Sequence, residues 1–218
     1  MTIRHQETKT VFGLWNGAKA GGKVPARGAI EPRSFARHLG QICLLEKSGP
    51  DATIRLGGTS VCALFGKELR GGHFGALFTR GARLSVQAAL ARGLTLSQPM
   101  VIEAIGETES GRQIGVEILL LPLSDAQGHV TQALAYLQPL DPIARLVGEP
   151  LSAFRFLGMS EAIVSGNDLD GGTGPRRPVE AVKAAARPNL RLVVSNPMAA
   201  AANLLRRARP EAALGLVT

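Results

Sequence analysis

RQIGVEILLLPLS, residues 112–124, is the stretch of sequence that decides the fold, because its alternate residues form two different faces. The first face is apolar throughout and consists of Ile114, Val116, Ile118 and Leu120. The second face starts polar and becomes apolar, in the order Gln113, Glu117, Leu119, Leu121 and Leu123. A β-strand with this pattern buries its first face in a core and leaves an apolar second face that another element must cover. The sequence therefore predicts a sheet with structure on both sides.

Four further segments have strand patterns and place this strand in an antiparallel sheet. Two of them flank it along the chain, SQPMVIEAIGETE (97–109) and HVTQALAYLQPL (129–140). The other two form a hairpin around SGPD, QICLLEK (41–47) and ATIRLGG (52–58). Between the hairpin and the later strands lie short helical pieces broken by glycine, followed by a better-formed helix at 82–94. The predicted order is two strands, a belt of short helices and three long strands.

An amphipathic helix is predicted at residues 8–20, before the first strand. Its apolar residues recur at the helical spacing i, i+3, i+4 and i+7: Val11, Leu14, Trp15 and Ala18. This helix is the obvious cover for the second apolar face of the sheet, to which the last strand also contributes. The candidates for helix packing or for a dimer surface are Leu14, Trp15, Leu119, Leu121, Leu123, Leu134 and Tyr136.

Length and composition favour one good core with an extension. The 218 residues are 45% hydrophobic, and the formal net charge of +8 corresponds to a pI near 10.3. This charge favours an acidic partner, which could be nucleic acid, an anionic membrane surface or a protein. Cys43 and Cys62 both lie in apolar surroundings, as buried reduced thiols do. Because no segment has the pattern of a signal peptide or a transmembrane helix, we expect a cytoplasmic protein.

The composition changes beyond about residue 158. SGNDLDGGTGPRRP (165–178) is typical of a flexible linker. Residues 171–218 carry eight Arg and Lys against two Glu, so most of the excess charge lies in this tail. PMAAAANLLRRAR (197–209) has a basic amphipathic pattern suited to anionic lipid, nucleic acid or an acidic partner helix, although a solvated, partly disordered extension is the simpler interpretation. No helix-turn-helix, zinc spacing or aromatic-basic pattern predicts sequence-specific DNA binding.

Four stretches carry a resemblance to a known family: LWNGAKAGGKVPARGAIEPRSFARHLGQICLLEK, IRLGGTSVCALFGKELRGG, VEILLLPL and DPIARLVGEPLSAFRFLG. Together they resemble the stand-alone PAS-domain proteins common in alphaproteobacteria, over roughly residues 10–158. With the helix described above, the resemblance implies an α+β fold: a five-stranded antiparallel sheet, a helical belt on one face and the N-terminal amphipathic helix on the other. It divides the chain into the N-terminal helix (1–24), the PAS domain (25–158) and a linker with a flexible, basic, partly disordered or helical tail (159–218).

The resemblance also implies a sensory or interaction module. PAS domains hold a small ligand between helices and sheet, dimerise and pass a signal through flanking helices. The side chains that would line such a pocket are Leu64, Phe65, Leu69, His73, Phe74, Leu77, Phe78, Leu90, Ile102, Val116 and Ile118. The same set describes an ordinary filled core, which we favour over a cavity for a small apolar ligand.

The sequence leaves the cofactor unknown. In the resemblance, His73 falls near the helix that supplies the axial histidine of haem-binding PAS domains, where an imidazole could ligate iron. A polar cap or a solvated ring is the interpretation we favour for His73. Flavin photochemistry needs a cysteine in the same region, and GGHFGALF (71–78) has none. The glycines of RLGGTSVC (55–62) lack the lysine of a phosphate-binding loop and indicate a sharp strand-to-helix turn.

No catalytic constellation stands out in the sequence. We find no serine elbow, spaced Cys and His, paired carboxylates or metal-ligand spacing, and we expect four acidic residues to lie on a solvated part of the sheet: Glu103, Glu107, Glu109 and Glu117. We predict a non-catalytic sensory or protein-interaction module of bacterial signal transduction, forming a homodimer and binding a protein partner. The alternative is a basic-tailed scaffold or adaptor that binds an acidic protein, an anionic membrane or nucleic acid through residues 171–218.

Overall fold

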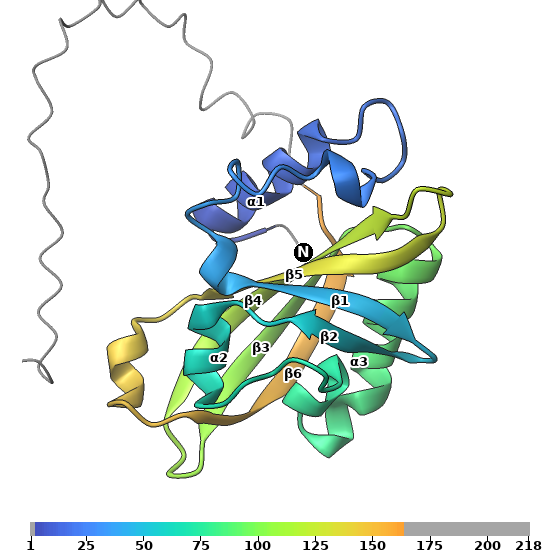
Figure 1. The fold of residues 1–218 in the computed structure, drawn as a ribbon. Helices are drawn as coiled ribbons and strands as arrows, with labels where there is room; N and C mark the ends of the chain where they lie inside the picture. Colours follow the sequence, from blue (N-terminus) through green and yellow to red (C-terminus); the bar gives the residue numbers. More distant parts are fainter. Residues whose placement is uncertain (1–2, 164–218) are drawn as a thin grey trace, which may run out of the picture. The chain divides into compact units, whose positions relative to one another are not determined.

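Six strands form one antiparallel sheet in the computed structural model, which describes residues 3–163 (Figure 1). The strands are β1 (Ile42–Ser48), β2 (Asp51–Leu56), β3 (Met100–Thr108), β4 (Gln113–Ser124), β5 (Val130–Pro139) and β6 (Leu151–Glu161). Their order across the sheet is β2-β1-β5-β4-β3-β6. β4, the stretch that decides the fold, lies between β5 and β3 and is buried on both faces from Val116 onward. The sheet therefore carries structure on both sides, as predicted.

The sixth strand corrects the prediction of five. β6 pairs with β3 and forms one edge of the sheet, and η6 (Ile143–Leu146) connects it to β5. The β3–β6 register shifts twice, once between Glu103 and Ala104 and once between Glu107 and Thr108. Each shift breaks the alternation of buried and exposed residues, so β6 does not show the period of two that identifies a strand in sequence.

A belt of helices covers one face of the sheet, which we call the inner face (Figure 1). The belt consists of α2 (Thr59–Phe65), η3 (Phe74–Leu77), η4 (Arg80–Ala82), α3 (Arg83–Leu90) and η5 (Ala91–Thr95). The helix predicted over residues 82–94 is divided, because α3 ends at Leu90 and continues as the π-helical turn η5. The buried face of α3, Val86, Ala89 and Leu90, packs into the same core as the strands.

The N-terminal helix covers the opposite, outer face, as predicted. α1 (Gln6–Gly17) contacts β4 and β5 and buries Thr8, Val11, Phe12 and Trp15. His5 caps the helix, because its Nδ1 accepts a hydrogen bond of 3.2 Å from the Glu7 amide. Residues 18–41 then return to β1 through the short helices η1 (Arg27–Ala29) and η2 (Leu39–Gln41).

The glycine pair before α2 has a structural role. A Cβ added to Gly58 would collide with the Gly40 carbonyl, and one added to Gly57 would lie 2.9 Å from Cys62 Sγ. Only glycine therefore lets the end of β2 turn into α2 at this distance from η2. This agrees with the sharp turn predicted for RLGGTSVC.

The predicted linker and basic tail fall outside the described residues from residue 164 onward. β6 ends at Glu161 and so crosses the domain boundary predicted at residue 158. None of the helices in the described part of the chain is long and apolar enough to span a membrane.

Candidate functional sites on the two faces of the sheet

The inner face of the sheet carries one continuous core of buried side chains. Ten of the eleven predicted pocket residues are buried there in one cluster: Leu64, Phe65, Leu69, Phe74, Leu77, Phe78, Leu90, Ile102, Val116 and Ile118. The cluster also includes residues of the strands, among them Leu45, Ile54 and Leu120. The structure therefore brings these ten predicted residues together in one apolar layer between the belt and the sheet.

Phe154 of β6 belongs to this core, and the sequence analysis missed it. Its ring is fully buried, with its centroid 5.1 Å from that of Phe65 and 5.4 Å from that of Phe78. Phe78 in turn lies 5.6 Å from Phe74, so the four rings form a continuous aromatic group between belt and sheet. β6, the strand that the sequence did not predict, therefore supplies the ring that lies between Phe65 of α2 and Phe78, the residue directly after η3.

His73 lies apart from the other pocket candidates. It is exposed, directly before η3, and its backbone forms a bridge with Thr53 of β2. The structure therefore corrects its grouping with the pocket residues, because the backbone pairing holds His73 at the edge of the sheet. Within residues 3–163, no three His, Cys, Asp or Glu side chains gather into a group that could hold a metal ion.

The two cysteines differ in their surroundings. Cys43 is fully buried in the inner core, and burial raises the pKa of its thiol to about 11. Cys62 is partly exposed, and its Sγ lies 3.7 Å from Glu68 Oε1. The Glu68 carboxylate also accepts the amide hydrogens of Arg70 and Leu69, and these hydrogen bonds lower its pKa. The buried thiol is thus protonated and unreactive near neutral pH.

The outer face contains a second, separate core beneath α1. It buries Trp15, Leu119, Leu121, Leu123, Leu134 and Tyr136, with Leu14 partly buried against it. The Trp15 indole N–H donates a hydrogen bond of 2.9 Å to the carbonyl oxygen of Pro122 in β4. The predicted helix-packing residues therefore contact one another within a single chain.

Glu117 is the polar group that the sequence analysis placed wrongly. It was expected to face solvent, yet it is fully buried on the outer face of β4. Its carboxylate accepts the amide hydrogen of Arg4 at 2.8 Å and that of His5 at 3.2 Å. Glu117 therefore holds the chain just before α1 against the sheet, because its carboxylate accepts the last two amide hydrogens before the helix.

His38 and Tyr136 form a second buried polar contact on this face. The His38 ring is buried and meets Tyr136 edge-on, with the ring centroids 5.6 Å apart. Burial lowers the pKa of His38, although the Glu7 carboxylate 3.5 Å from its Nε2 opposes this effect. The Tyr136 hydroxyl donates a hydrogen bond of 2.6 Å to Gln138 Oε1, and burial raises the pKa of Tyr136.

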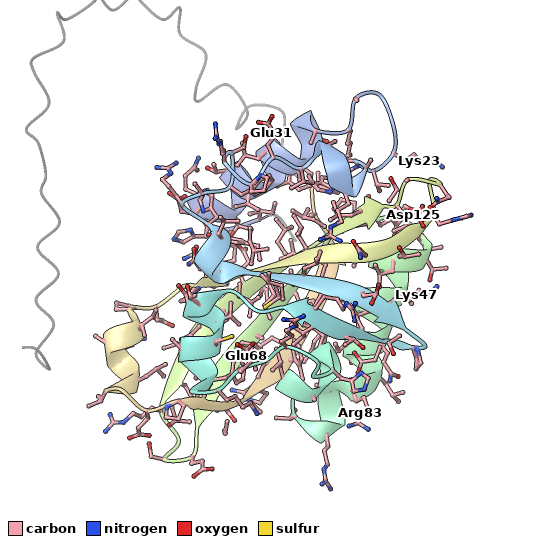
Figure 2. The ribbon with its side chains drawn as sticks, in the orientation of Figure 1. Lys23, Glu31, Lys47, Glu68, Arg83 and Asp125 are labelled. Carbon is pink, nitrogen blue, oxygen red and sulfur yellow. The ribbon has the colours of Figure 1, made fainter. Side chains whose placement is uncertain are left out.

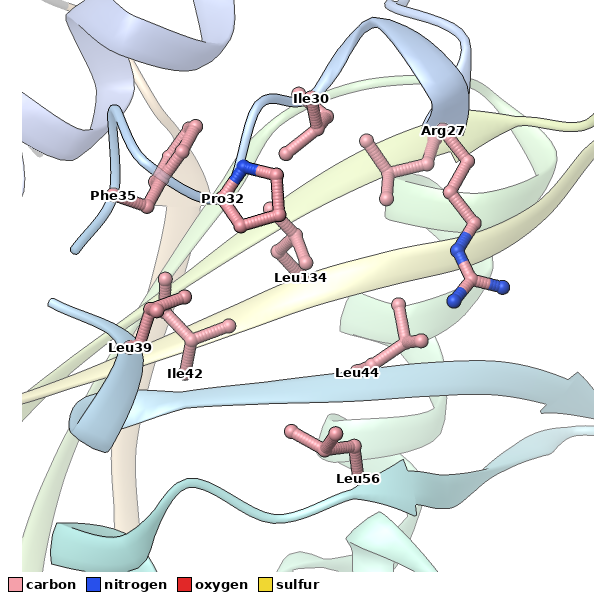
Figure 3. Close-up of a pocket in the computed structure, with 10 residues that line it drawn as sticks. Arg27, Ile30, Pro32, Phe35, Leu39, Ile42, Leu44, Leu56 and Leu134 are labelled. Atoms are coloured by element: carbon pink, nitrogen blue, oxygen red, sulfur yellow. The ribbon is translucent and has the colours of Figure 1, made fainter.

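Beside this polar contact, an apolar groove of about 210 Å³ opens on the outer face (Figure 3). Its wall comes from the segment before β1: Arg27, Ile30, Pro32, Phe35 and Leu39. Its floor comes from four strands: Ile42, Leu44, Leu56, Leu123 and Leu134. In Figure 3 the Arg27 side chain extends from the wall toward β1 at one end, while Leu39 and Ile42 lie at the other. No motif in the sequence predicts this groove.

The fold is an antiparallel sheet with a helical belt on one face and helix α1 on the other. Residues 3–138 match the family described as PAS domain, so the chain belongs to the PAS family. PAS domains serve in general as sensory modules of signalling proteins. A comparison with curated proteins gave no match.

Three solved structures of light-oxygen-voltage proteins are similar to this chain at low sequence identity. A light-oxygen-voltage domain studied with a flavin analogue is 14% identical, with a TM-score of 0.42, covering 53% of this chain and 87% of that one. An RNA-binding light-oxygen-voltage receptor is 18% identical, with a TM-score of 0.40, covering 57% of this chain and 37% of that one. The dark state of the Aureochrome1 light-oxygen-voltage domain is 12% identical, with a TM-score of 0.39, covering 53% and 86%.

Proposed function

We propose that this chain is a non-catalytic PAS interaction module of bacterial signalling, which works in the cytoplasm by binding a protein partner. One observation carries the proposal: the outer face opens into an apolar groove with exposed leucines, whereas the predicted pocket residues lie buried in one core together with Phe154. A domain that stores its ligand internally needs space between belt and sheet. A domain that binds proteins needs apolar surface open to solvent.

Homodimer formation is a second part of this proposal. The candidate contact surface is α1 with the strand surface beside it, in the region of Leu14 and the groove. Leu14 is only partly buried against the outer core, so its side chain contributes apolar area to the solvent-facing side of the helix.

The test is to denature the purified protein, analyse the released fraction for small molecules and screen metabolites for a rise in Tm. We expect no stoichiometric release and no compound that raises Tm by stabilising the inner core. A released metabolite, or a compound whose effect is lost when a residue of the inner core is substituted, would contradict the proposal in favour of a ligand sensor.

The basic tail supports a second candidate function, binding to an acidic surface. Residues 171–218 hold six of the eight net positive charges of the chain. If the tail alone provides the function, deleting residues 171–218 abolishes binding, and affinity for anionic vesicles or RNA falls steeply with salt. If the PAS domain provides it, partner binding survives the deletion.

A further inference from the structure

The apolar groove on the outer face is open and lacks a cover within the described chain. Nine of its ten lining residues are apolar, and two of them lie largely in solvent, Leu56 at 55% exposure and Leu39 at 45%. Exposed apolar side chains around a concave apolar floor are typical of a contact surface for another molecule.

The size of the groove favours protein side chains over a small ligand. Pockets that enclose drug-sized molecules span about 300–1,000 Å³, and this groove offers only about 210 Å³. It can receive a few aliphatic groups presented by a larger partner. An amphipathic helix presents such groups at positions i, i+3 or i+4, and i+7.

Addition of a partner strand at the neighbouring sheet edge is blocked. The outer edge of β2 already pairs with the chain after α2: the Ile54 amide donates to the Gly72 carbonyl at 2.8 Å, and the Gly71 amide donates to the Ile54 carbonyl at 2.8 Å. A partner at the groove must therefore bind through its side chains.

Charge distinguishes the wall of the groove from the rest of the described chain. Residues 3–163 contain seventeen Lys and Arg against thirteen Asp and Glu, an excess of four. Residues 18–41 alone contain five against one, which is also an excess of four: Lys19, Lys23, Arg27, Arg33 and Arg37 against Glu31. Figure 2 shows Lys23 and Glu31 on this segment. Outside residues 18–41 the positive and negative charges of residues 3–163 cancel. The excess positive charge of the described chain therefore lies on the segment that contributes the wall of the groove.

Arg27 is available to a partner. Among the described residues no carboxylate pairs with it, whereas Arg55, on the strand side, pairs with Glu46 at 3.1 Å. The guanidinium at the end of the groove is exposed and can donate two parallel hydrogen bonds to a carboxylate.

We propose that the groove binds an amphipathic helix of a partner protein whose polar face is acidic. Its apolar side chains enter between Phe35 and Leu134, and its carboxylates face Arg27, with Arg33 and Arg37 on the same basic segment. The inference rests on the proposed function, since it specifies the chemistry and the place of the protein partner. A helix with a basic polar face is rejected by like-charge repulsion at the wall.

The experiment is a peptide selection against the full 218-residue chain. The library consists of helical peptides with leucine at i, i+3, i+4 and i+7 and with Glu, Asp, Lys, Arg, Ser or Ala at the other positions. The tightest peptide is then labelled, and its Kd is measured by fluorescence anisotropy. We expect the selected peptides to be rich in Glu and Asp.

Matched variants locate the binding site. Leu56→Lys places a charge on the groove floor and should weaken binding by more than tenfold, whereas Leu84→Lys changes an exposed leucine on α3, far from the groove lining, and should leave Kd unchanged. Arg27→Glu should weaken binding about tenfold, whereas Arg83→Glu, the same charge change on α3, should have no effect. Circular dichroism of all four variants checks that each of them folds.

Three outcomes would overturn the inference: basic or uncharged selected peptides, equal binding by Leu56→Lys and Leu84→Lys, or binding of phosphatidylglycerol vesicles that Leu56→Lys abolishes. The last result would assign the groove to lipid. These outcomes are distinguishable from a failure of the proposed function. That failure would be the release of a small molecule from the inner core of protein to which no peptide had been added.

Discussion

The inner face of the sheet is covered by aromatic and aliphatic side chains from the belt and β6, whereas the outer face is covered by one helix that depends on a few buried polar groups. On the inner face Phe154 connects α2 to η3 through ring contacts. On the outer face Glu117, Trp15 and His38 fix α1 and the following segment by individual interactions. The inner face therefore has the larger apolar core, and the outer face has a smaller core with apolar surface beside it that a partner can reach.

The largest effect should come from the inner face. Phe154→Ala removes a fully buried ring from the aromatic group and should lower the free energy of unfolding by about 3–5 kcal/mol in urea denaturation. Leu157→Ala, in the same strand but 52% exposed, is the control and should change it by about 0.5 kcal/mol or less. Equal effects in the two variants would show that β6 does not insert Phe154 into the core.

The second effect should come from the anchor of α1. Glu117→Ala leaves the partly buried Arg4 and His5 amides without their acceptor and should cost about 1–3 kcal/mol. Hydrogen exchange should accelerate in α1 more than in the belt, because the helix loses its attachment to β4. Glu109→Ala, on the exposed β3–β4 turn, is the control. Unchanged exchange in α1 would contradict the anchoring role of Glu117.

A smaller effect should appear as a dependence of stability on pH. The pKa of His38 is lowered in the folded protein by burial, so the unfolded chain binds this proton more readily. Stability from this group is present above pH 6.5 and is lost as the pH falls from there through the lowered folded pKa. Tm measured from pH 8 to pH 5.5 should therefore fall, and His38→Gln should reduce the fall while His129→Gln should not. A Tm that rises on acidification only when His38 is present would contradict this sign.

The smallest effect should be a gain. The Thr8 hydroxyl is buried beneath α1, and no described residue forms a hydrogen bond with its Oγ1. Thr8→Val replaces it with a methyl group of similar shape and should raise stability by about 1 kcal/mol. Thr10→Val is the matched control, because Thr10 donates to the Gln6 carbonyl on the exposed side of the helix. A loss of stability in Thr8→Val would show that the hydroxyl has a role in packing α1.

The central strands and α1 were predictable because their patterns are complete. In β4 every second residue from Ile114 to Leu120 is apolar, and the change of polarity on its second face predicted the helix above it. β6 was not predictable by this means, since two register shifts interrupt its alternation and leave Leu157 in solvent. A strand with bulges needs knowledge of its partner strand, which local sequence does not contain.

The site residues were predictable only as core residues. Ten of the pocket candidates share an apolar character that a filled core and a cavity both require, so composition could not separate the two. Glu117 could have been suspected, because a single carboxylate between Val116 and Ile118 precedes three buried leucines of the same face. The groove could not have been predicted, because it is formed by residues that are distant in sequence, such as Arg27, Leu56 and Leu134.

Native mass spectrometry of the freshly purified chain, combined with an absorbance scan through the visible range, tests the central claim most directly. The proposed interaction module without an internal ligand predicts a mass equal to the polypeptide, or to a multiple of it, with no absorbance beyond that of the protein. A bound small molecule, or a haem or flavin band, would contradict the claim and make the space between belt and sheet the functional site.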